Sequence, residues 1–237
     1  MLEKSMENKG EVWDRLDQLD LAKNILLAEP LDIGTDILEI GLDHWFQSEI
    51  ITEVPVLGSL IRAGKTIASI NDMFFIKKVL TFVKAIHDQK EIEGKWKEHR
   101  EKLINDKKLL NKEIEIILIY LDKQTHYVKS QILGSFYSLY FKKKIDWEEF
   151  QILAEILEMV SVFDLATLRE LYNERVYHQG KKYNKLALKR LSSSGLVDYF
   201  NGMLVTAKGQ RNEEPHYAEI TELGDFFVEY GLVNINW

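Results

Sequence analysis

The sequence predicts a mainly α-helical protein, in which an N-terminal multi-helix bundle is followed by a small α+β winged helix-turn-helix domain. The first observation is that apolar residues recur at the three-to-four spacing of a helix through most of residues 35–162. The second is that this pattern shortens after residue 163, where two short helices give way to strand-like runs and turns. The third is that the chain has only three prolines, each where an element is expected to break.

This change of pattern divides the chain into three expected parts. Residues 1–34 should form an N-terminal segment that is partly helical or flexible, residues 35–162 the bundle, and residues 163–237 the winged-helix-like domain. The 237 residues are 46% apolar, which is enough to bury a sizeable core and excludes a wholly disordered chain.

In the bundle, several helix starts are marked by residues suited to that position. Pro55 can open a helix because the first helical residue needs no amide donor. Asp146 and Glu149 have the spacing of a capping box ahead of an apolar run. The segment 89–106 has few apolar positions, so its helix is expected on the outside of the bundle. The bundle helices are expected at 36–46, 55–70, 74–86, 89–106, 109–121, 128–141 and 146–160.

The C-terminal part has the element order of a winged helix-turn-helix. Asp164 should cap a first helix, and Gly195 is the residue expected after the end of a second one. Asn201-Gly202 is a strong hairpin signal after a strand, and Thr221 should cap a last helix. The expected elements are helices at 164–177 and 183–193, a strand at 196–200, a returning segment at 203–206, a strand at 216–220 and a final helix.

Charge and cysteine content exclude several classes of function. The absence of cysteine excludes a disulfide framework, a thiolate zinc site and a cysteine nucleophile, and it fits a reducing cytoplasm. The net charge of −7 argues against a protein that coats nucleic acid through its overall field. The N-terminal residues do not resemble a secretory signal, and no stretch is apolar enough for a conventional membrane span. We therefore expect a cytoplasmic protein, with a peripheral position at the inner membrane as a variant.

Motifs for catalysis and cofactor binding are also missing. The segment 58–66 resembles a phosphate loop, but five residues instead of four separate Gly58 from Gly64. Among the six histidines, Glu-x-x-His spacing occurs only between Glu213 and His216, in an expected loop. No serine lies in a nucleophile motif. We therefore expect a protein that is not an enzyme and has no cofactor or metal.

Basic residues gather on the second helix of the predicted helix-turn-helix. Lys182, Lys185 and Lys189 fall on one face of that helix, which enters the major groove in DNA-binding members of this class. Acidic residues nevertheless slightly outnumber basic ones in 164–237, so a solvated face used for protein contact is the alternative. The candidate nucleic-acid contacts are Lys181, Lys182, Lys185, Lys189, Arg190, Lys208 and Arg211.

The helices expected at 55–70 and 74–86 combine an apolar stripe with basic flanks. This combination is typical of a helix in a membrane interface, but it is also the ordinary pattern of a core helix whose lysines lie at the rim. Core packing is the favoured interpretation. The candidate membrane or partner face consists of Leu57, Leu60, Ile61, Phe74, Phe75 and Phe82.

Two sets of motifs resemble known bacterial families. Segments 36–43, 51–60 and 76–82, with Lys65, resemble a widespread set of bacterial proteins of unknown function that share an Ile-Pro-Val-Gly opening and a Phe-Leu-Lys-Lys continuation. Gly195-Leu-Val and Ile220-Thr-Glu-Leu-Gly resemble the abortive-infection alpha family, which pairs a helical body with a winged-helix-like tail. This resemblance implies a role in phage defence, and it carries over no active-site residue because the shared motifs are structural.

The leading functional hypothesis is a non-enzymatic bacterial interaction protein, whose helical body docks a protein partner or self-associates and whose winged module is a second docking surface or a sensor. The resemblance places this role in phage defence. The alternative is a winged-helix transcriptional regulator that binds DNA. A second alternative is an effector that contacts the membrane through the apolar helices at 54–86.

Overall fold

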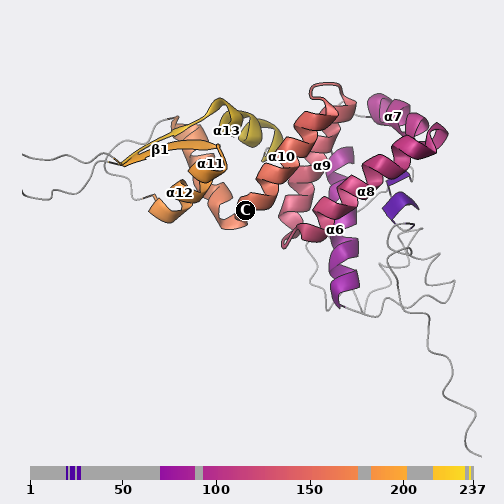
Figure 1. Ribbon diagram of the computed structural model, residues 1–237, viewed down its shortest axis with the longest axis horizontal. Helices are drawn as coiled ribbons and strands as arrows, with labels where there is room; N and C mark the ends of the chain where they lie inside the picture. Colours follow the sequence, from indigo (N-terminus) through magenta and orange to yellow (C-terminus); the bar gives the residue numbers. More distant parts are fainter. Residues whose placement is uncertain are drawn as a thin grey trace, which may run out of the picture. The chain divides into compact units, whose positions relative to one another are not determined.

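The protein is mainly helical and contains one small antiparallel sheet of two strands (Figure 1). The computed structural model describes residues 20, 22–24, 26–27, 70–88, 93–175, 183–201, 216–232 and 235. The helices expected at 36–46 and 55–70, and the returning segment at 203–206, therefore lie outside the described residues.

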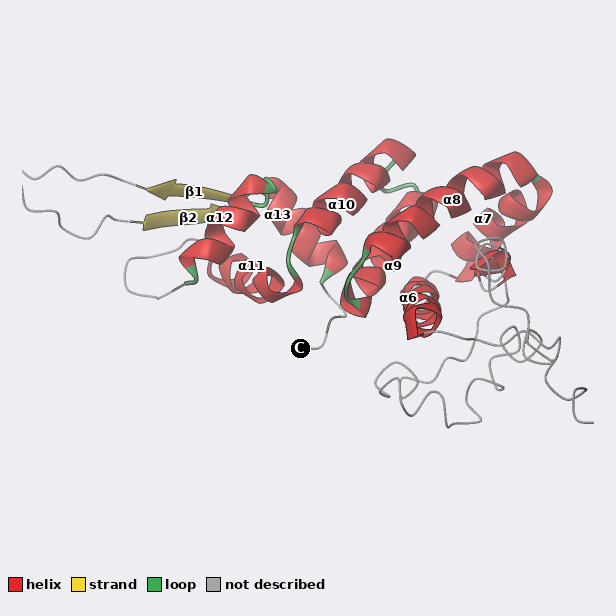
Figure 2. Ribbon diagram, turned by 60° about the horizontal axis from the view of Figure 1, so that its bottom comes forward, coloured by secondary structure: helices red, strands yellow, loops and turns green. Residues whose placement is uncertain are grey.

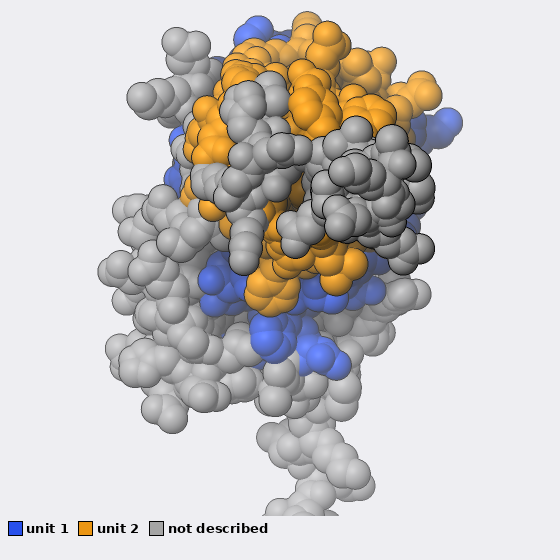
Figure 3. Space-filling view, turned by 90° about the vertical axis from the view of Figure 1, so that its left-hand side faces the viewer, with its two compact units in different colours: residues 1–142 blue, residues 143–237 orange. Residues whose placement is uncertain are grey.

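The chain divides into two compact units, Met1–Lys142 and Lys143–Trp237, which Figure 3 distinguishes by colour. The division falls before helix α10 (Trp147–Met159), so this helix belongs to the second unit. The sequence pattern predicts the same segment at the end of the bundle. The domain boundary at 162–163 stays a prediction, because a cut between compact units and a boundary between folding domains need not coincide.

In the first unit, helix α6 (Ile70–His87) packs along helix α9 (Tyr127–Phe141). Both helices are largely apolar, as their sequences predict, and α9 buries most of its residues. Their backbones meet at Gly134, where an added Cβ would lie 2.4 Å from the Phe82 carbonyl oxygen. A residue without a side chain is therefore needed at this crossing.

Helices α7 (Glu93–Asn105) and α8 (Lys107–Lys123) are joined by Asp106. The Asp106 carboxylate accepts hydrogen bonds from two amides of the first turn of α8, each at 3.0 Å, so it is the N-cap. α7 is mostly exposed, as its charged sequence predicts, but it buries Trp96, His99 and Leu103. These three positions have the helical spacing of an inward-facing stripe.

In the second unit, α10 begins with the predicted capping box: Asp146 and Glu149 each accept the backbone N–H of the other, at 2.8 and 2.7 Å. Helix α11 (Val162–Glu174) follows. The prediction that Asp164 is its N-cap is wrong, because the cap position is Ser161 and Asp164 lies buried in the first turn. The Asp164 carboxylate instead binds a guanidinium from helix α12.

Helix α12 (Lys185–Ser193) leads into strands β1 (Val197–Asn201) and β2 (His216–Ile220), which pair antiparallel (Figure 2). Val197 lies opposite Ile220, and Asn201 lies opposite His216. The predicted strand 196–200 is thus confirmed with a shift of one residue, and the predicted strand 216–220 is confirmed with its bounds. The partner of β1 among the described residues is β2, beyond the segment 202–215.

The last helical elements of the described residues are helix α13 (Glu222–Phe226) and a π-helical turn, η1 (Phe227–Gly231). Thr221 caps α13 as predicted, since its hydroxyl accepts the Gly224 N–H at 3.0 Å. Arg169 of α11 donates hydrogen bonds to the carbonyl oxygens of Leu232 and Ile235, and partial burial lowers the pKa of its guanidinium. These contacts hold the C-terminal residues against α11.

Candidate functional site

Helix α12 has one buried and one exposed side, and its N-terminus is fixed by a side-chain cap. The Asn184 side chain accepts the backbone N–H groups of Leu186 and Ala187 at 3.0 and 3.3 Å. Lys185 and Lys189 are exposed, as predicted for contacts to a partner or to phosphate. Leu186 is also exposed, to 60%, so the outer side of the helix is not purely basic. The buried residues of α12 are Ala187, Leu188 and Leu191.

Arg190 is also exposed, but its guanidinium is paired with a carboxylate of helix α11. Its guanidinium donates two hydrogen bonds to the Asp164 carboxylate, Nε to Oδ2 at 2.6 Å and Nη2 to Oδ1 at 2.5 Å. Such a bidentate pair fixes the orientation of the guanidinium, and the hydrogen bonds to Asp164 raise the pKa of Arg190. Because Asp164 is buried, separating the pair would leave its charge uncompensated. Arg190 therefore links α12 to α11, and its role as a nucleic-acid contact stays a prediction.

The other predicted basic contacts precede α12 or β2 in the sequence. Lys181, Lys182, Lys208 and Arg211 lie outside the described residues, so their role as nucleic-acid contacts stays a prediction. Lys185, Lys189 and Arg190 are the predicted contacts that are exposed among the described residues, and of these Arg190 is paired with Asp164.

Exposed apolar side chains lie at the junction between α10 and α11. Phe163, in the first turn of α11, is 89% exposed, and Met159, the last residue of α10, is 63% exposed. Phenylalanine is among the residues most often found buried, so the exposed ring of Phe163 is a candidate for contact with a partner.

The sheet carries a third set of exposed side chains, which we call the outer strand face: Asp198, Phe200, Tyr217 and Glu219. The register places Asp198 opposite Glu219 and Phe200 opposite Tyr217. The two rings are 6.2 Å apart between centroids, and the Tyr217 hydroxyl donates a hydrogen bond to Glu219 Oε2 at 2.7 Å. This hydrogen bond, with smaller contributions from partial desolvation and the two carboxylate charges, raises the pKa of Tyr217.

In the first unit, the candidate membrane or partner face is mostly internal. Phe75 and Phe82 are buried, and Phe82 packs against Tyr137 with ring centroids 5.6 Å apart. These two residues therefore lie in the core, as the favoured interpretation of that stripe expects, and the role of the candidate face stays a prediction. Phe74 is exposed to 45% and stays a candidate. The remaining members, Leu57, Leu60 and Ile61, lie outside the described residues.

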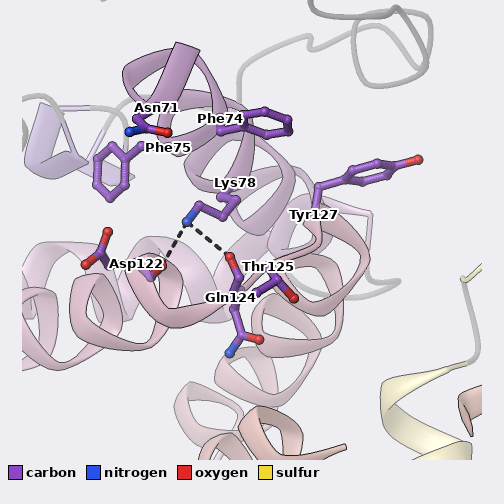
Figure 4. A pocket seen from close by; sticks show the side chains of 8 residues that line it. All are labelled: Asn71, Phe74, Phe75, Lys78, Asp122, Gln124, Thr125 and Tyr127. Atoms are coloured by element: carbon purple, nitrogen blue, oxygen red, sulfur yellow. Dashed lines mark hydrogen bonds between the residues drawn. The ribbon is translucent and has the colours of Figure 1, made fainter. Parts of the chain in front are cut away.

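A pocket of about 340 Å³ lies where α6 passes the end of α8 (Figure 4). Lys78 projects into it and donates hydrogen bonds to the carbonyl oxygens of Asp122 and Gln124, at 3.1 and 3.3 Å. Asp122 lies in the last turn of α8 and Gln124 is its C-cap, a position where a cation is favoured by the helix dipole. Burial lowers the pKa of Lys78, and the charge of Asp122 opposes this shift. The pocket is lined by Asn71, Phe74, Phe75, Lys78, Asp122, Gln124, Thr125 and Tyr127.

A buried polar cluster joins α7, α8 and α9, and sequence reasoning missed it. Glu113, 1% exposed, accepts hydrogen bonds from the hydroxyls of Tyr137 and Tyr140 at 2.7 and 2.8 Å. His99 Nε2 lies 3.1 Å from Glu113 Oε2 and 2.9 Å from the Tyr137 hydroxyl. Desolvation is the largest cause that raises the pKa of Tyr137, and Glu113 adds to it. These contacts supply a buried carboxylate with hydrogen-bond partners from α7 and α9.

The described residues form neither a metal-binding side-chain cluster nor a membrane-spanning helix. Among them, no cluster of three or more His, Cys, Asp or Glu side chains could hold a metal ion. None of the described helices combines the length and apolar character needed to cross a bilayer.

Comparisons with known proteins find no match. No family model, no curated protein and no solved structure matches the chain. The functional argument therefore depends on the surfaces described above.

Proposed function

We propose that this chain is a non-enzymatic interaction protein, in which a helical body is joined to a winged-helix-like module that contacts another protein. We also propose a role in bacterial phage defence, for which the support is the resemblance of residues 195–197 and 220–224 to the abortive-infection alpha family.

The element order of the second unit supports the winged-helix assignment. α11, α12, β1 and β2 follow one another as a helix-turn-helix followed by a hairpin, and the two strands are antiparallel. In this assignment α12 is the second helix of the helix-turn-helix, and the segment between the strands corresponds to the wing.

The observation that carries the proposal of protein contact is the exposure of Phe163. Moving a fully exposed phenylalanine side chain into an interface is worth about 1.5–3 kcal/mol. Aromatic anchors of this kind supply most of the affinity at protein interfaces. Met159, one turn earlier in the chain, adds a second exposed apolar side chain to the same junction.

A DNA-binding regulator is the second candidate, and the exposed Lys185 and Lys189 favour it. Three observations weigh against it. Arg190 is held by Asp164, Leu186 occupies the outer side of α12 between the two lysines, and the outer strand face is acidic. Since phosphate neutralisation dominates affinity for DNA, two free cations on this helix are a small supply.

A phage challenge tests the protein-contact proposal. Bacteria that express the wild-type chain should plate phage with lower efficiency than cells without it, and Phe163→Asp should remove that protection. Ile119→Asp is the matched control, because Ile119 is a 51% exposed apolar residue on α8. Helix content and melting temperature should be unchanged in both variants. Full protection by Phe163→Asp would refute the proposed surface, and a wild type without protection against any phage tried would refute the proposed role.

A titration with duplex DNA distinguishes the DNA-binding candidate from the proposal of protein contact. Fluorescence anisotropy with a labelled duplex should give no saturable binding at low salt. Binding that falls steeply with salt and is lost in Lys185→Glu/Lys189→Glu would replace the proposal by a DNA-binding function. Flotation with anionic vesicles tests the membrane alternative in the same way, with Phe74→Asp as the variant, since Phe74 is the exposed described member of that face.

A further inference from the structure

We propose that the outer strand face is a docking site for a basic segment of the partner protein, whose Lys or Arg side chains lie between Asp198 and Glu219. This inference deepens the proposed function, because it names the chemistry of the partner. It rests on one part of that function, namely that the second unit contacts another protein.

The first step is the alternation of side chains along the two strands. Val197, Ala218 and Ile220 are buried on the inner side of the sheet, whereas all four residues of the outer strand face are exposed. Residues directly opposite in an antiparallel pair have Cβ atoms about 4.5–5.5 Å apart. The register therefore gathers two carboxylates and two aromatic rings into one small surface.

The second step is the charge of this surface. Asp198 and Glu219 carry like charges at directly opposite positions, an arrangement that destabilises a sheet. No described lysine or arginine forms an ion pair with either carboxylate, and the hydrogen bond that Glu219 accepts from the described residues comes from the neutral hydroxyl of Tyr217. A cation supplied by a partner would relieve the repulsion, and a guanidinium could bond both carboxylates.

The third step is the aromatic pair beside the carboxylates. Phe200 is 59% exposed and lies next to Tyr217, so the pair offers ring faces to solvent. Guanidinium and ammonium groups are attracted to such ring faces, and their methylene stems can cover the apolar surface. Carboxylates flanked by aromatic rings therefore match Lys or Arg, whereas they repel the phosphates of nucleic acid or of an anionic membrane.

The experiment is a titration of the full chain into a fluorescein-labelled peptide of alternating arginine and glycine, followed by anisotropy. Saturable binding at low salt should weaken as salt is added. Asp198→Asn/Glu219→Gln should lower the affinity about fivefold to tenfold, the loss expected for two exposed charge contacts. Phe200→Ala should lower it by a smaller factor. Glu155→Gln/Glu170→Gln is the matched control, since it removes two exposed carboxylates from α10 and α11 and changes the net charge equally.

Four results would overturn the inference: no binding by the wild type, an equal loss in the control variant, equal binding of a glutamate–glycine peptide, or a wild type that self-associates through this face. The last is recognised by sedimentation, if Asp198→Asn/Glu219→Gln becomes monomeric. The proposed function is tested separately, since Phe163→Asp would still remove phage protection if only the inference about the basic segment were wrong.

Discussion

The backbones of α6 and α9 lie close together at Gly134, and Gly134→Ala tests whether that approach stabilises the first unit. The added Cβ would lie 2.4 Å from the Phe82 carbonyl oxygen and 2.9 Å from Ala85 Cβ. Ordinary contacts begin near 3.4 Å, so the helices must separate locally by about 1 Å. Overpacking of this kind costs about 1–3 kcal/mol, and the higher helix propensity of alanine returns up to about 1 kcal/mol. We expect a net loss of about 1–2 kcal/mol.

Gly94→Ala is the matched control for this prediction. Gly94 lies in α7, and nothing is within 4 Å of a Cβ added there, so the same change should be neutral or stabilising by up to about 1 kcal/mol. Urea unfolding followed by circular dichroism measures both free energies, and hydrogen exchange of α6 and α9 peptides assigns the loss to the first unit. Equal stability of the two variants would refute the account of the helix crossing.

Three further predictions concern buried polar groups. Glu113→Gln should destabilise the first unit by about 1–3 kcal/mol in urea unfolding. Tyr137 and Tyr140 donate to different oxygens of the Glu113 carboxylate, so the amide replaces one of these two acceptors by an NH₂ group and removes the charge that strengthens the other hydrogen bond. Unchanged stability would contradict this. Because burial lowers the pKa of Lys78, the folded chain binds fewer protons than the unfolded chain between that lowered value and 10.5, so stability should rise with pH in this window. Lys78→Met should reduce the rise measured up to pH 10 in urea titrations, and an unaltered slope would contradict the assignment. Asp164→Asn should lower the unfolding midpoint of the second unit more than Glu170→Gln does, as read by hydrogen exchange of α11 and α12, because it removes the partner of Arg190.

Elements whose ends are marked by local chemistry were predictable from the sequence. The capping box at Asp146, the cap at Thr221 and the strand 216–220 depend on residues within a few positions of one another, and the structure confirms each of them. The element order of the second unit was predictable for the same reason. Its assignment as a winged helix stays a proposal.

Features that depend on distant residues were not predictable from the sequence. Glu113 falls on the apolar stripe of α8 beside Ile114 and Ile117, and a carboxylate in that position was the available signal of a buried polar cluster. Its tyrosine partners lie on α9, 24 and 27 positions away, so their contact required the fold. Asp164 was misassigned as a cap because its partner, Arg190, lies 26 positions along the chain.

The contact between Arg169 and the C-terminal residues sets the shortest form in which the second unit can be expressed. A fragment that ends at Gly231 would lack both carbonyl acceptors of the partly buried Arg169 guanidinium. This loss would destabilise α11, although Arg169 lies 66 positions before Ile235 in the chain. An expression fragment of this unit should therefore retain Ile235, and a purification tag is better placed ahead of α10 than directly after Leu232.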